Sequence, residues 1–179
     1  MGATKELTSE HKNILQVIDA LERECAALDS GKAVDSVFFA KAVDFIRSYA
    51  DKFHHAKEED ILFAELSGPG VAMHCDPREQ MLYEHDAGRK FVRGLEEAVA
   101  AGDKGRVVEN AGGYAQLLRQ HIYKEDRILY PMAEQALGEE RGAKMAERFR
   151  AVDEKFAAAN EKQLAFVREA SERYTQKAA

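Results

Sequence analysis

Two stretches of the sequence carry the same arrangement of histidine and glutamate. Residues 54–63 read HHAKEEDILF and residues 121–130 read HIYKEDRILY, and each begins with a histidine that a glutamate follows four positions later. Upstream of each stretch stands a Glu-His pair. The repeated histidines and glutamates are His11, His54, Glu58, His85, His121 and Glu125. Imidazole and carboxylate groups together bind metal ions, so we expect each half of the chain to supply half of a metal site.

Helical geometry predicts which of these side chains share a face. Successive residues of an α-helix lie about 100° apart, so Glu58 falls about 40° from His54 and between His54 and His55. A carboxylate has two oxygens, and Glu58 could therefore bridge two ions, with His54 on one and His55 on the other. Glu125 has the same relation to His121. Asp126 would point away, about 140° from His121, unless the helix bulges, so Glu125 is the preferred ligand.

The cost of burial favours two cations. The candidate ligands occupy helix stripes on which leucine would be expected, and an unpaired buried polar group costs about 2–7 kcal/mol. No lysine or arginine is expected on these stripes at the same level, so a pair of divalent ions would balance the carboxylates. The seven candidates, more than one ion takes, are His11, His54, His55, Glu58, His85, His121 and Glu125. This ligand set suits iron, manganese or zinc, and iron best where oxygen chemistry is involved.

Four long helices must position these residues. Apolar residues step by three and four over residues 5–28, 35–66, 76–102 and from 103 onward, with Asp35 and Asp76 as expected caps. Pro131 should kink the fourth helix or end its first segment. Residues 139–174 are helical in pattern but strongly charged, which predicts extra helices packed outside the bundle and frayed last residues. The expected fold is an all-α, up-down four-helix bundle (1–137) with a C-terminal helical extension (138–179).

Length, charge and cysteine content argue against several classes of function. A chain of 179 residues is one ordinary domain, and its formal charge of -6 argues against nucleic acid as a partner. No apolar run is long enough to cross a bilayer, and no signal-peptide pattern occurs. Cys25 and Cys75 have no zinc or redox spacing, which argues against a structural zinc site or an iron–sulfur cluster. We therefore expect a cytoplasmic protein with reduced thiols and no membrane partner.

The repeated motifs and the Glu-His pairs together resemble those of a known protein family. The sequence resembles hemerythrin-like proteins of the bacterial and archaeal type, with the His-His-x-x-Glu-Glu signature. The stretches that carry it are 9–11, 54–63, 84–89 and 121–131, within residues 7–137. The resemblance implies the four-helix bundle known from myohemerythrin, with two iron ions in a non-haem di-iron centre that carboxylates and an oxo or hydroxo species bridge. Carried over, the ligands are the six repeated residues, with His55 as the seventh.

The sequence also departs from the oxygen carriers of that family. Those carriers place a second histidine four residues from the one on the third helix, and here the corresponding positions are Met81 and Arg89. They also use an aspartate five residues after the fourth-helix histidine. Here Asp126 stands at that position, but Glu125, four residues after His121, competes with it. The first difference argues against a dedicated reversible oxygen carrier, because it changes how one iron is ligated.

The expected function is a di-iron protein that binds or senses O2, NO or peroxide, or buffers iron. Two alternatives stay open: a di-iron redox enzyme (a peroxidase, oxidase or NO reductase) with an electron donor, and a zinc-bound structural or interaction module. Whether the protein is an enzyme stays open because no substrate pocket or acid–base pair is identifiable. Tyr130 is expected to pack, Glu59 and Asp126 to be solvated or to contact a ligand, and His74 and Cys75 to be ordinary loop residues.

Overall fold

The computed structural model describes residues 4–175, and within them every regular element is a helix. The first rod is α1 (Lys5–Asp29). The second is assembled from α2 (Ser36–Phe45), the π-helical segments η1 (Ile46–His55) and η2 (Glu58–Leu62), and α3 (Phe63–Leu66). The third is α4 (Arg78–Ala101), and the fourth joins α5 (Lys104–Lys124) to the π-helical η3 (Glu125–Leu129). The long α6 (Tyr130–Thr175) follows directly.

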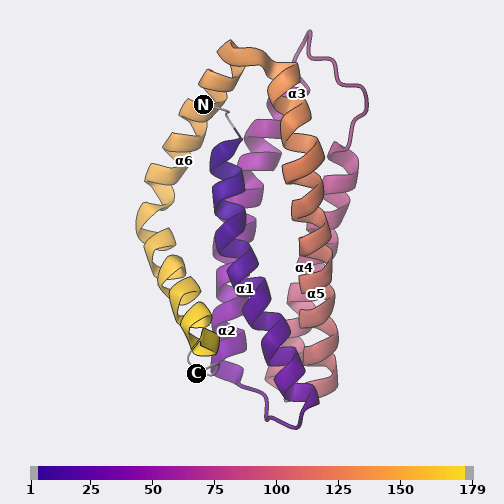
Figure 1. The fold of residues 1–179 in the computed structure, drawn as a ribbon, viewed down its shortest axis with the longest axis vertical. Coiled ribbons are helices and arrows are strands. Elements are labelled where there is room, and N and C mark those ends of the chain that lie inside the picture. The colour runs from indigo at the N-terminus through magenta and orange to yellow at the C-terminus, as the bar shows by residue number, and fades with distance from the viewer. Residues whose placement is uncertain (1–3, 176–179) are drawn as a thin grey trace.

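The four rods pack side by side as a bundle, which confirms the predicted all-α fold (Figure 1). Helix α6 continues upward from α5, turns over, and runs back along the outside of the bundle beside α1 and α2. It is interrupted at Gly138, where φ is 67° and ψ is -177°. A left-handed φ is readily adopted by glycine, so the chain can reverse there without strain.

Local signals start and stop these helices largely where expected. The Asp35 carboxylate accepts a 3.0 Å hydrogen bond from the Phe38 backbone N–H, which caps α2. Gly102 ends α4 with a φ of 64°. The start of α4 differs slightly from prediction, because Pro77 occupies the cap position and the helix begins at Arg78.

The structure corrects one of the two alternatives expected for Pro131, that the first segment of the fourth helix would end there. The helix neither ends nor breaks at this residue, which is the second residue of α6, and the interruption comes seven residues later at Gly138. The π-helical η3 immediately precedes Pro131. Proline lacks an N–H and its ring crowds the preceding turn, and the wider π-helical turn accommodates both without ending the helix.

The site residues occupy a level between two apolar clusters. The larger cluster includes Ile14, Phe53 and Leu118, and the smaller includes Leu7 and Leu129. Helix α6 contributes to both, through its buried residues Met145, Phe149, Phe166, Val167 and Ala170. Burial of these side chains against the bundle is the dominant stabilising contribution to the packing of α6.

Candidate metal centre

The structure brings all seven predicted ligands together at one level of the bundle. Their donor atoms form two groups, and within each group the atoms lie within 4.8 Å of one another. The first group is His11, His54, Glu58 and Glu125, and the second is His55, Glu58, His85 and His121. All seven side chains are buried. His54 and His55 fall into different groups with Glu58 in both, as the helical geometry predicts.

Two glutamates connect the groups. The Glu58 Oε2 atom lies 3.8 Å from His54 Nε2 and 3.5 Å from His85 Nε2. The Glu125 carboxylate reaches 3.3 Å from His11 Nε2 with one oxygen and 3.0 Å from His121 Nε2 with the other. Each of these glutamates is the first residue of a π-helical segment, so the two repeated sequence stretches also share this backbone conformation.

The imidazoles face one another in pairs. The Nε2 atoms of His11 and His54 are 3.0 Å apart, and those of His85 and His121 are also 3.0 Å apart. On the outer side of the rings, each Nδ1 lies 2.7–2.9 Å from a carboxylate oxygen: His11 with Asp126, His54 with Glu10, His85 with Glu59 and His121 with Glu84. Donation from Nδ1–H to a carboxylate leaves Nε2 as a bare lone pair aimed at the centre of the site.

These contacts show which histidines Glu10 and Glu84 orient. Glu10 and Glu84 do not orient the histidines that follow them in the sequence. They cross the bundle to the histidines of other helices, Glu10 to His54 and Glu84 to His121. Such a carboxylate fixes the ring orientation and increases the basicity of the nitrogen that faces the metal.

The carboxylates make this part of the bundle favourable for positive charge. Burial lowers the pKa of His121, but Glu125 and Glu84 outweigh it and raise the pKa to about 10. Burial likewise opposes the charged form of His11, whereas Asp126 and Glu125 raise its pKa to about 9. The interior of the site therefore stabilises cations.

Several of the buried donor atoms also lack a hydrogen-bond partner, as is expected of atoms that bind metal ions. Among the described side chains, the buried polar atoms without a hydrogen-bond partner include Glu58 Oε2 and both carboxylate oxygens of Glu125, whereas His55 Nδ1 lies 3.5 Å from Asp51 Oδ1. Leaving such atoms unpaired in the interior is costly. Facing nitrogen lone pairs and unpaired carboxylate oxygens are what divalent cations bind, so these residues fit the two ions that the sequence predicts.

Two site residues were not foreseen. Tyr130, expected only to pack, is buried and donates a 2.6 Å hydrogen bond from its hydroxyl to Glu58 Oε1. Lys57 is also fully buried, although no cation was expected at this level. Its ammonium group donates to Glu10 at 2.6 Å, to Glu6 at 2.9 Å and to Asp153 of α6. The ammonium group thereby links α6 to the carboxylate that orients His54.

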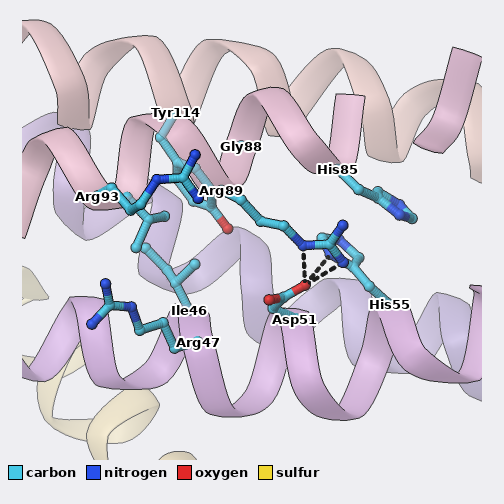
Figure 2. Close-up of a pocket in the computed structure, with 10 residues that line it drawn as sticks. Ile46, Arg47, Asp51, His55, His85, Gly88, Arg89, Arg93 and Tyr114 are labelled. Carbon is cyan, nitrogen blue, oxygen red and sulfur yellow. Dashed lines mark hydrogen bonds and ion pairs between the residues drawn. The ribbon is translucent and has the colours of Figure 1, made fainter. Parts of the chain in front are cut away.

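His55 joins the site to a cavity. Its ring stacks on His85 with 3.8 Å between centroids, and both residues line a cavity of about 220 Å³ (Figure 2). Arg89 lies along the same cavity and pairs with Asp51 and Glu59. His74 and Cys75 are exposed in the loop before α4 and belong to neither donor group.

The fold and the site together define a helical-bundle protein with two adjoining buried groups of histidine and glutamate that could hold cations. The family described as the Hemerythrin HHE cation binding domain matches residues 2–133, and the chain belongs to this family. Neither the curated proteins nor the solved structures gave a significant match. The family match ends before Asp153, so that residue is a feature of the C-terminal helix.

No helix within the described part of the chain is both long and apolar enough to cross a membrane.

Removal of the metal should destabilise the bundle, because the folded state loses the free energy of metal binding and only protons on the histidines are left to balance the buried carboxylates. We expect chelation to lower the melting temperature by at least about 5 °C, the shift that a loss of about 2 kcal/mol causes in a domain of this size. The measurement is calorimetry on metal-loaded protein and on protein shown to be metal-free. Identical melting curves would place the metal outside the buried groups.

Proposed function

We propose that the two donor groups hold two iron ions as a non-haem di-iron centre that binds O2, NO or peroxide. His11 and His54 would hold one ion, and His55, His85 and His121 the other. Glu58 and Glu125 would bridge them. The observation that carries this proposal is the membership of Glu58 in both groups, with a Glu125 oxygen beside a histidine of each.

Iron, when bound, supplies the coordination and redox chemistry for small oxygen and nitrogen ligands. The protein would supply four donor residues to one ion and five to the other, which would leave room on bound iron for a small ligand. Four outer carboxylates orient the histidines, and apolar clusters above and below exclude water. The Tyr130 hydroxyl donates a 2.6 Å hydrogen bond to Glu58 Oε1, which keeps this oxygen in place. The cavity beside His55 and His85 gives a small ligand a route to the site.

The other functions that the sequence leaves open differ from this one in measurable ways. Iron buffering would show as iron release under mild reduction, without a ligand complex. A redox enzyme would consume peroxide, O2 or NO continuously with an electron donor. A zinc module would hold zinc after growth with ample iron.

We expect anaerobic, reduced protein to bind NO or react with O2 or peroxide, with a new absorption band that saturates at a fixed ratio to protein. Reduced protein with NO should also give an iron–nitrosyl signal in electron paramagnetic resonance. His55→Ala should alter the signal, because His55 belongs to the second group and also lines the cavity. A reduced, iron-loaded protein whose spectra do not respond to any of the three ligands would contradict the proposal.

A further inference from the structure

The cavity extends well beyond the metal centre. It runs between the second helical rod and α4, with Tyr114 of α5 at its back (Figure 2). Ten residues line it: Ile46, Arg47, Asp51, His55, His85, Gly88, Arg89, Val92, Arg93 and Tyr114. Arg47, Arg93 and Tyr114 lie at one end, and His55 and His85 lie at the other. The volume of about 220 Å³ is below that of sites for drug-sized ligands and suits a smaller molecule.

The Tyr114 hydroxyl is an unused hydrogen-bonding group in this cavity. Tyr114 is only 2% exposed, and its oxygen has no hydrogen-bond partner among the described residues. Its ring crosses from α5 towards the space between the helices, so that the hydroxyl points into the cavity (Figure 2). A buried hydroxyl without a partner is costly. A ligand that accepts a hydrogen bond at this position would remove that cost.

The lining carries an excess of positive charge. It contains three arginines, two histidines, a tyrosine and one acid, Asp51, whose carboxylate Arg89 already binds. Arg47 pairs with Glu96 on the surface, whereas Arg93, which is exposed at the mouth of the cavity, has no carboxylate partner among the described side chains. Ile46 and Val92 provide apolar wall between the charged end and the histidines. A complementary ligand therefore has a negative group at one end and a short apolar body.

We propose that this cavity binds a small aliphatic carboxylate. Its carboxylate lies between the Arg93 guanidinium and the Tyr114 hydroxyl, with Arg47 nearby, and its chain runs past Ile46 and Val92 towards His55 and His85. The end of the cavity that holds the carboxylate contains none of the candidate metal donors, so the inference does not rest on the proposed function. If iron is present, the far end of the ligand occupies the approach to the second donor group.

Hexanoate titrated into protein as purified, followed by isothermal calorimetry, tests the site. We expect saturable binding of one hexanoate per chain. The neutral analogue 1-hexanol should bind at least about tenfold more weakly, a difference of about 1.4 kcal/mol. Arg93→Gln should weaken hexanoate binding about tenfold. The matched control Arg106→Gln, which removes an exposed arginine of α5 that pairs with Glu97, should leave it unchanged.

Tyr114→Phe separates a loss of ligand binding from a loss of folding. It removes the unpartnered hydroxyl, so the melting temperature should be retained or raised while hexanoate binding weakens several-fold. Three results would overturn the inference: no saturable binding, equal binding of hexanoate and 1-hexanol, or equal effects of Arg93→Gln and Arg106→Gln. Hexanoate binding that needs iron and ignores Arg93→Gln would also overturn it, because the carboxylate would then bind the metal. None of these results changes the iron content, so failure here is distinguishable from failure of the proposed di-iron centre.

Discussion

Replacing Glu125 with alanine should cost the protein both of its metal ions. Its two oxygens lie 3.3 Å from His11 Nε2 and 3.0 Å from His121 Nε2, in different donor groups, and neither has a hydrogen-bond partner among the described residues. A shared ligand holds both ions, so its loss should release or disorder both. Metal analysis after purification should show iron close to zero in Glu125→Ala, and also in Glu58→Ala.

The neighbouring acids provide the matched controls. Asp126 and Glu59 contact the Nδ1 atoms of His11 and His85 and do not belong to the donor groups. Removal of such an outer carboxylate should weaken metal binding about 10–100-fold, so Asp126→Ala and Glu59→Ala should still fill with excess iron. His55→Ala should keep one ion firmly and lose or loosen the other. Full iron content in Glu125→Ala with loss in Asp126→Ala would show that the fourth helix uses the aspartate of the oxygen carriers.

The second large effect concerns Lys57. Burial lowers the pKa of its ammonium group, but Glu10 and Asp153 outweigh burial and raise the pKa, so the group stays charged. Lys57→Met would leave the Glu10 and Glu6 carboxylates facing each other without a cation. We expect a loss of about 3–5 kcal/mol in the free energy of unfolding, the usual cost of breaking a buried ion pair from one side. Urea unfolding measures it.

Two further variants separate burial from charge. Lys144→Met removes a lysine that pairs with Glu140 on the surface of α6, and stability should stay nearly unchanged. Asp153→Asn should destabilise less than Lys57→Met but in the same direction, because α6 would lose its contact with the buried ammonium group. If Lys57→Met were as stable as the wild type, the network would have no role in holding α6 or Glu10.

The helices and the inward-facing ligands could be predicted because both follow from local periodicity. His54, Glu58, His121 and Glu125 recur at a fixed spacing that places them on one face. The same reasoning could not pair residues across the bundle. Glu10 stands beside His11 in the sequence but contacts His54, since which helices are neighbours decides the contact.

Lys57 and Tyr130 could not be predicted for related reasons. Lys57 lies three residues after His54 among charged residues, a position typical of a solvated lysine. It is buried because α6 folds back over the bundle and brings Asp153 to it. Tyr130 follows an apolar run, and only the tertiary structure directs its hydroxyl to Glu58. The π-helical segments that begin at Glu58 and Glu125 have no simple sequence signal of their own.

The central claim is that two metal ions share Glu58 and Glu125. Its most direct test combines iron analysis with Mössbauer and electron paramagnetic resonance spectroscopy of oxidised protein, purified without a metal-binding tag after growth with ample iron. We predict two irons per chain whose spins are coupled through the bridging ligands, so that the diferric form gives no paramagnetic resonance signal. One iron per chain, two uncoupled irons with a full ferric signal, or zinc alone would contradict the account.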